Sequence, residues 1–337
     1  MDRRTVLGLG MTAALAGLTR RAFAENMNAE GALSTDPAEI VPLWPGTPPG
    51  GEGVKLEAKI VERSSDTSEY HDRVVTDIGT PLLTVFRPSR PDGSAVLIAP
   101  GGGYIRIVID KEGVEAARRL NASGVTVFML RYRLPAEGWA GGKDVPLQDA
   151  QRAMRIIRAG AQGYGIDPAR LGVLGFSAGG HVAAMLATKF DAAVYRPVDD
   201  IDAMDAKPVF AGLMYPVVTM SAEGAHPGSR LKLLGSNPSE ALVEAYSCEK
   251  LVTHETPPSF ICFAADDKDV PPMANGMAMF EALRRAKVAA ELHVFEEGGH
   301  GFGLRLARGK PASAWPELFL HWGYSNGWIR DASAAPG

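Results

Sequence analysis

The sequence predicts one α/β domain, in which a mostly parallel sheet is covered by helices on both of its faces. From residue 95 onward, short apolar runs typical of buried strands alternate with segments whose apolar residues recur at helical spacing. Such alternation is typical of parallel sheets, because each crossover helix packs back onto the sheet. The chain has 337 residues, of which 46% are hydrophobic and 22% are charged, and this is enough to fill one large core.

Residues 1–24 are predicted to be an export signal and are left out of the fold. Arg3 and Arg4 precede an apolar run at 6–18, and Ala22-Phe23-Ala24 matches an A-x-A cleavage pattern. The paired arginines resemble the bacterial twin-arginine signal, which implies a periplasmic or secreted protein. The apolar run is too short to span a membrane.

The next segments frame the domain. Residues 25–53 are rich in proline and lack periodicity, so they are predicted to form an extended arm that leads into a single domain at 54–331. Residues 332–337 are expected to be a loose tail. At the start of the domain, residues 56–62 and 82–86 alternate apolar and polar side chains, which predicts two antiparallel edge strands.

The alternating elements follow in order along the chain. Strands are expected at 95–99, 125–130, 171–174, 209–215, 259–265 and 291–295. Helices are expected at 112–123, at 147–162, from 178 onward, at 275–286 and at 314–329. Two long segments, 189–208 and 216–258, lack periodicity and interrupt the alternation. Because long loops in a compact domain are often functional, these two are candidate lids over a site at the strand ends.

The turn between the strand at 171–174 and the helix that follows carries the most specific motif. Gly175-Phe176-Ser177-Ala178-Gly179 fits the G-x-S-x-G nucleophile elbow. Glycines at both ends of the motif allow the strand and the helix to approach closely, while the serine Oγ stands exposed on a strained turn. Ser177 is therefore the candidate nucleophile.

A serine nucleophile needs a base and a group that orients the base, and with this elbow the chain order is serine, acid, histidine. Among the histidines after Ser177, His300 follows the last predicted strand in a glycine-rich loop, which makes it the candidate base. The acid is expected after the preceding strand, where the loop reads Asp266-Asp267-Lys268-Asp269-Val270-Pro271. The D-x-x-V-P spacing favours Asp267, with Asp266 as the main alternative.

A glycine-rich turn, Gly101-Gly102-Gly103-Tyr104, follows the predicted strand at 95–99. Consecutive glycines let backbone N–H groups approach a carbonyl oxygen, and with the N–H of Ala178 they are expected to form an oxyanion hole. A phosphate-binding loop is the competing interpretation of such a turn. The turn lacks the Lys-Ser/Thr pair and the G-x-G-x-x-G spacing of such loops, so this interpretation is disfavoured.

Charge and cysteine content narrow the function further. The formal net charge is −4, which argues against a nucleic-acid partner. Cys248 and Cys262 show no metal-ligand spacing and are expected to be unpaired small hydrophobic residues, although an oxidising compartment would permit a disulfide. The acidic run at 199–202 lacks the glycine and the terminal glutamate of a calcium loop. No metal or cofactor is expected.

Four motifs in this order resemble those of the α/β-hydrolase superfamily, in particular bacterial acetyl-xylan-esterase-like and feruloyl-esterase-like carbohydrate esterases near the hormone-sensitive-lipase type. They lie at 100–104, 175–181, 267–271 and 299–302, and the resemblance covers roughly residues 56–330. It implies that Gly102, Gly103 and Ala178 donate to the oxyanion. Pro100 stands where the lipase-type pattern usually has histidine, which leaves the N–H groups in place but weakens the transfer of lipase specificity.

The resemblance implies a serine carboxylic-ester hydrolase that works through an acyl-enzyme. Short acyl groups on plant polysaccharide fragments such as acetylated xylan are the expected substrates, and Tyr104 and Trp139 are candidate side chains for stacking against a sugar. The alternatives are a lipase-like esterase for other small esters, a peptidase of the same fold, and a non-catalytic carbohydrate-binding relative. No feature of the sequence indicates the oligomeric state.

Overall fold

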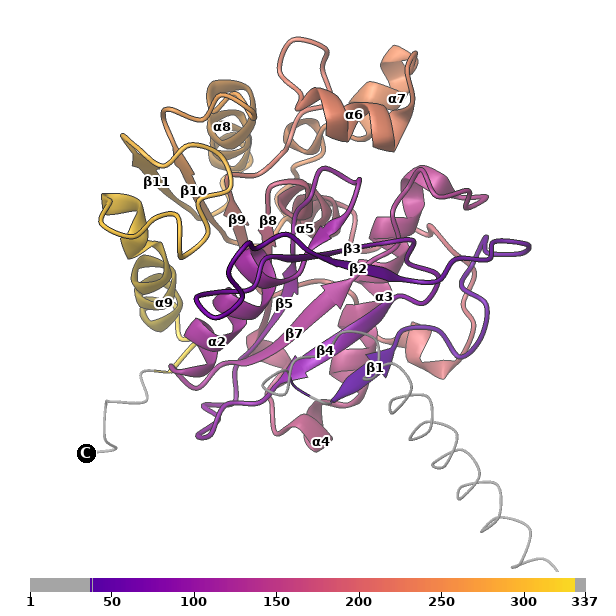
Figure 1. Cartoon of the computed structure of the whole chain (residues 1–337), viewed down its shortest axis with the longest axis horizontal. Coiled ribbons are helices and arrows are strands. Elements are labelled where there is room, and N and C mark those ends of the chain that lie inside the picture. Colours follow the sequence, from indigo (N-terminus) through magenta and orange to yellow (C-terminus); the bar gives the residue numbers. More distant parts are fainter. Residues whose placement is uncertain (1–36, 38, 331–337) are drawn as a thin grey trace, which may run out of the picture.

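The computed structural model describes residue 37 and residues 39–330, and Figure 1 shows their arrangement. Within them, eight strands form one sheet in the order β1-β4-β7-β5-β8-β9-β10-β11. These strands are β1 (Ile40–Pro42), β4 (Leu82–Phe86), β5 (Ala95–Ala99), β7 (Thr126–Arg131), β8 (Leu171–Phe176), β9 (Ala211–Met214), β10 (Ser259–Ala264) and β11 (Ala290–Phe295). The predicted export signal at 1–24, residues 25–36 of the arm and the tail at 332–337 lie outside the described residues.

The prediction of a mostly parallel sheet is confirmed. The six strands from β7 to β11 in the sheet order are parallel, whereas β4 runs antiparallel to both β7 and β1. Every residue of β5, β8 and β10 is buried, as expected for parallel strands that are covered on both faces. At one end of the sheet, β11 pairs with β10 alone and its residues are only partly buried.

Helices cover both faces of this sheet. The chain moves one way along the sheet from β5 through α2 (Glu115–Asn121) to β7, and then reverses direction through α3 (Val145–Ala159), α5 (Ala178–Thr188) and α8 (Ala278–Arg285). Because β–α–β connections are right-handed, this reversal places α2 on the opposite face from the other three. The last helix, α9 (Trp315–Ser325), contacts α2 and so covers the same face.

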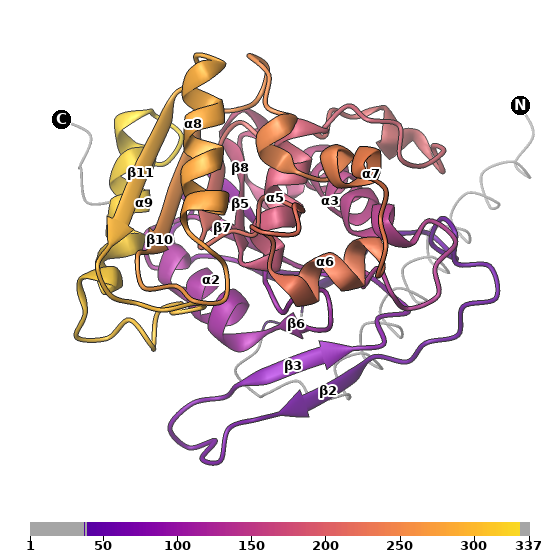
Figure 2. The same ribbon diagram turned by 90° about the horizontal axis from the view of Figure 1, so that it is seen from above.

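Of the two predicted antiparallel edge strands, the one at 56–62 lies at the edge of a separate sheet, which agrees with the prediction. The one at 82–86 is β4, which lies between β1 and β7, so its prediction as an edge strand is wrong. Residues Lys59–Glu62 form β2 in a separate antiparallel sheet with β3 (Arg73–Thr76) and β6 (Ile107–Val108). Three of the four residues of β2 are exposed, so its apolar alternation reflects a surface ribbon and not a core edge. Figure 2 shows β2 and β3 (purple) on the outside of the domain, away from the larger sheet.

Part of the predicted arm supplies the missing edge of the main sheet. Ile40–Pro42 forms β1, which pairs antiparallel with β4. Proline is tolerated there because an edge strand leaves some backbone groups without a partner strand. An edge strand of three residues is too short to show the period of two that sequence patterns depend on.

The candidate lid at 216–258 is not a non-periodic loop. It contains α6 (Pro227–Leu234), α7 (Glu240–Ala245) and a 3-10 turn, η5 (Cys248–Lys250), and Figure 1 shows α6 and α7 together at the top of the molecule. Side chains of His226 and Ser239 accept hydrogen bonds from backbone N–H groups at the starts of the two helices. These helices are too short for a periodic pattern, although the N-caps and Pro227 are start signals in the sequence. The candidate lid at 189–208 holds one 3-10 turn, η4 (Asp200–Ala203).

Both cysteines are free and buried, which confirms the prediction that they are unpaired. Cys248 begins η5 and Cys262 lies in β10. A further short helix, α4 (Ala161–Tyr164), follows α3. No helix within the described residues is both long and apolar enough to cross a membrane.

Candidate active site

Ser177 lies on a tight turn between β8 and α5, as the motif predicts. Its backbone has φ 53° and ψ −118°, a conformation that is strained for a residue with a side chain. A Cβ atom on Gly175 would lie 2.2 Å from the carbonyl oxygen of Gly179, and one on Gly179 would lie 2.0 Å from that of Ala99. Glycine is therefore required at both ends of the motif for the helix to approach the sheet this closely.

Three side chains from three separate strand ends meet at this turn. The Oγ of Ser177 lies 2.7 Å from Nε2 of His300, and Nδ1 of the same imidazole lies 2.7 Å from Oδ2 of Asp267. Because a carboxylate only accepts hydrogen bonds, Nδ1 carries a proton and Nε2 of the neutral ring is left to accept from the serine hydroxyl. The arrangement can withdraw the serine proton as the oxygen attacks a carbonyl carbon.

The structure separates the two aspartates that compete as the triad acid. The side chain of Asp267 is 1% exposed, and its Oδ1 accepts hydrogen bonds from the N–H groups of Asp269 and Val270, which fixes the carboxylate beneath His300. Asp266 instead accepts from the N–H groups of the glycines at 298 and 299, at 3.0 and 2.7 Å. Asp266 therefore holds the histidine loop to the acid loop but does not contact the imidazole.

The glycine turn expected to supply oxyanion donors lies against the nucleophile. A Cβ atom on Gly101 would lie 2.8 Å from Cβ of Ser177. Gly102 and Gly103 have positive φ values, 128° and 67°, and among the described residues neither N–H donates a hydrogen bond. Ala178 is the first residue of α5, so its N–H has no acceptor within the helix. These N–H groups are thus available for a negatively charged oxygen.

A buried carboxylate that the sequence analysis did not single out joins the glycine turn to the histidine loop. Glu112, 3% exposed, accepts from the N–H of Gly101 through Oε2 at 2.9 Å and from the hydroxyl of Tyr215 through Oε1 at 3.2 Å. The Tyr215 oxygen accepts in turn from the N–H of Gly303, and its ring packs edge-on against His300. Burial, with the adjacent Glu112, keeps the pKa of Tyr215 well above its ordinary value, so the hydroxyl remains a donor.

The expectation that Tyr104 and Trp139 stack against a sugar is not met. Tyr104 is 2% exposed, and its hydroxyl lies 2.8 Å from Nδ1 of His181 under the elbow helix. Trp139 is 6% exposed and its ring is covered by the guanidinium of Arg133, 5.0 Å from the ring centroid. Sugar stacking needs an accessible ring face, and both rings are packed inside the domain.

His181, which follows the elbow, makes the stability of the domain depend on pH. The imidazole is 1% exposed, with Nε2 2.8 Å from the carbonyl oxygen of Tyr246, and burial lowers its pKa from 6.5 to about 4. Between pH 6.5 and pH 4 the unfolded chain therefore binds more protons than the folded chain. The free energy of unfolding has its full value above pH 6.5 and decreases as the pH falls below it.

As the pH falls from about 7.5 to about 5, we expect the protonation of His181 in the unfolded chain to lower the free energy of unfolding by on the order of 2 kcal/mol. Urea unfolding across this range, compared between the wild type and His181→Gln, measures the effect. The variant has a lower stability throughout but a flatter dependence on pH. Equal slopes for the two proteins would show that another group causes the dependence.

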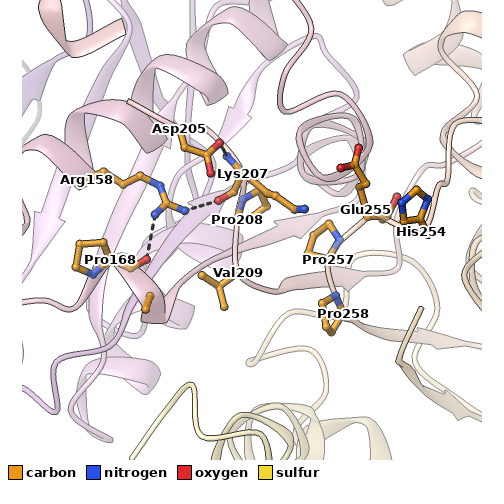
Figure 3. A pocket seen from close by; sticks show the side chains of 12 residues that line it. Arg158, Pro168, Asp205, Lys207, Pro208, Val209, His254, Glu255, Pro257 and Pro258 are labelled. Atoms are coloured by element: carbon orange, nitrogen blue, oxygen red, sulfur yellow. Dashed lines mark hydrogen bonds between the residues drawn. The ribbon is translucent and has the colours of Figure 1, made fainter. Parts of the chain in front are cut away.

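A cavity of about 570 Å³ lies away from this site (Figure 3). Its lining includes Pro168, Val209 and Pro258, which precede β8, β9 and β10. Ser177, Asp267 and His300 instead follow the carboxyl ends of their strands, so the cavity lies at the opposite edge of the sheet. Figure 3 shows the guanidinium of Arg158 bonded to the carbonyl groups of Pro168 and Lys207, so both of its terminal nitrogens donate within the protein.

The fold and the serine at a strand–helix elbow define the class of the protein, an α/β-hydrolase with a serine at the reactive position. Within this class, the chain belongs to the BD-FAE family, whose model matches residues 83–283. The prediction of an α/β-hydrolase related to bacterial carbohydrate esterases is confirmed.

Three relatives illustrate the similarity. The chain is 33% identical over 232 residues to an acetylxylan esterase of Xylanibacter ruminicola and 35% identical over 220 residues to endo-1,4-beta-xylanase B of Butyrivibrio fibrisolvens. These matches cover 68% and 65% of this chain but 45% and 34% of the relatives, so the chain spans less than half of either. The solved structure of an acetyl ester-xyloside bifunctional hydrolase from Caldicellulosiruptor lactoaceticus is 31% identical, with a TM-score of 0.69, covering 88% of this chain and 100% of that one.

Proposed function

We propose that this protein is a carboxylesterase that removes short acyl groups, acetyl above all, from fragments of xylan-type plant polysaccharides. The similarity to the acetylxylan esterase of Xylanibacter ruminicola carries the substrate class. The hydrogen-bonded chain from Ser177 through His300 to Asp267 supports the chemistry, because it supplies a nucleophile, a base and an orienting carboxylate for ester cleavage.

In the first half of the reaction, the Oγ of Ser177 attacks the ester carbonyl carbon and its proton passes to Nε2 of His300. The oxyanion that forms is stabilised by the N–H groups of Gly102, Gly103 and Ala178. As the intermediate collapses, the C–O bond to the alcohol breaks and the imidazolium returns the proton to the leaving oxygen. Asp267 stabilises the charged ring and holds it in position throughout.

In the second half, water takes the place of the alcohol. His300 removes a proton from the water, whose oxygen attacks the acyl carbon, and a second oxyanion forms in the same place. Collapse breaks the bond between the acyl carbon and Oγ of Ser177, and His300 returns the proton to the serine. The products are a carboxylic acid and the free enzyme.

Acetate release from acetylated xylo-oligosaccharides by the protein from residue 25 onward, with Ser177→Ala as the control, tests the proposal. We expect release by the wild type and not by the variant. If p-nitrophenyl acetate is cleaved but no acetate leaves the oligosaccharide, the chain remains an esterase and the xylan assignment is wrong. If the variant releases acetate at the wild-type rate, the role of Ser177 is wrong.

A further inference from the structure

His226 faces the reacting groups from the segment that begins α6. Its ring is nearly parallel to that of His300, with an interplanar angle of 8° and 6.5 Å between centroids. A Cβ atom on Gly103, in the glycine turn, would lie 3.6 Å from Cε1 of His226. The imidazole thus borders both the base and the oxyanion turn, and it is partly exposed.

The hydrogen bonds of His226 determine which ring nitrogen carries the proton. As the N-cap of α6, its Nδ1 accepts from the backbone N–H of Ser229 at 3.0 Å and lies 2.9 Å from the buried Ser229 hydroxyl. A backbone N–H can only donate, so Nδ1 is unprotonated and the proton of the neutral ring is on Nε2. Nε2 makes no hydrogen bond within the described residues, and the Nε2–H is free to donate to a bound molecule.

His226 also stays uncharged beside the base. Burial, followed by the neighbouring His300, keeps the pKa of His226 below its ordinary value, although Asp269 and Asp267 act in the opposite direction. A neutral donor can contact the substrate without repelling the imidazolium that forms on His300 during the reaction. The side chain therefore has the properties of a recognition group.

We propose that His226 binds the alcohol part of the ester, by donating its Nε2–H to a sugar hydroxyl or ring oxygen next to the scissile bond. This inference rests on the proposed function. The carbonyl oxygen is assigned to the glycine turn and Ala178, while the leaving oxygen must lie at His300, which protonates it. Because the ring of His226 lies beside that of His300, its donor is placed on the side of the alcohol. An acetyl group has no further acceptor, whereas a sugar carries several.

Two substitutions separate recognition from capping. His226→Asn keeps a short side-chain acceptor that caps α6 well but removes the Nε2–H donor. His226→Gln places an amide N–H near the position of Nε2 but weakens the cap. If His226 only capped the helix, the Asn variant would retain full activity, and the Gln variant would lose both activity and thermal stability.

We expect His226→Asn to lower kcat/KM for acetylated xylo-oligosaccharides by about tenfold, chiefly through KM, which is the size typical of one lost hydrogen bond to a substrate. The loss for p-nitrophenyl acetate is smaller, and the melting temperature remains close to that of the wild type. His226→Gln recovers part of the lost kcat/KM despite a lower melting temperature. Full activity of the Asn variant, or equal losses on both esters, would overturn the proposal.

Two small esters allow the role of His226 to be tested with the same variants even if xylan fragments are not substrates. Glycerol monoacetate and propyl acetate share the acyl group and the length of the alcohol but differ in hydroxyl groups. If the wild type does not act on acetylated xylo-oligosaccharides, the proposed function fails, and this pair still examines His226. A larger loss on glycerol monoacetate supports recognition of a hydroxylated alcohol, and equal losses contradict it.

Discussion

The Ser177→Ala variant is expected to hydrolyse p-nitrophenyl acetate with a kcat lower by about 10⁵-fold or more, while it retains the fold. The Oγ atom forms the bond to the acyl carbon. Neither of the side chains hydrogen-bonded in series with it, His300 and Asp267, can take over this step. Residual hydrolysis above the rate in water remains, because the N–H groups near Ser177 still stabilise an oxyanion formed by attack of water.

A fluorophosphonate label provides the accompanying control. It reacts with an activated serine, so the wild type is labelled at Ser177 and the variant is not. Circular dichroism and the melting temperature of the variant match those of the wild type, because an alanine adopts the positive φ at this position no less readily than serine. Labelling of the variant at another serine, together with undiminished turnover, would place the nucleophile elsewhere.

The Asp267→Asn variant is expected to lose about 10⁴-fold in kcat. The amide can present an N–H group where the carboxylate accepted, so Nδ1 of His300 loses its proton and Nε2 becomes protonated. The ring in this tautomer cannot accept the proton of Ser177, and it has also lost the negative charge that stabilised the imidazolium.

Asp266→Asn is the matched control, one residue away in the same loop. Its Oδ1 accepts two backbone N–H groups of the histidine loop, and the amide oxygen of asparagine can accept the same two bonds. We expect its kcat to stay within about threefold of the wild type. A loss as large as that of Asp267→Asn would show that the two carboxylates share the role of the acid.

The fold and the positions of Ser177, His300 and Asp267 could be predicted because their signals are local. The elbow depends on small residues within five positions, and the order of the motifs places each one after a strand that is recognisable from its own residues. The D-x-x-V-P spacing favoured Asp267 but left Asp266 as an alternative, since both aspartates follow β10. Their different hydrogen-bond partners in the folded chain distinguish the two.

The features that were missed depend on contacts between distant segments. Glu112 acts in the site through Gly101 and Tyr215, and no local pattern indicates that these lie together. His226, the N-cap of α6, lies beside His300 although the two are far apart in the sequence. The wrong prediction for Tyr104 as a sugar-stacking residue has the same origin. A tyrosine beside the glycine turn can point toward the substrate or toward His181, and in the structure its hydroxyl contacts His181.

The placement of β11 has a consequence for how the proposed activity would be lost. The loop with His300 follows β11, which is hydrogen-bonded to a strand on one side only and is partly exposed. Ser177 instead follows the fully buried β8. Segments of a native protein open locally at a lower free energy than the whole. Fraying of β11 would therefore move the base away from the serine while the centre of the sheet stays folded. Activity would then be lost under milder conditions than those that unfold the whole domain.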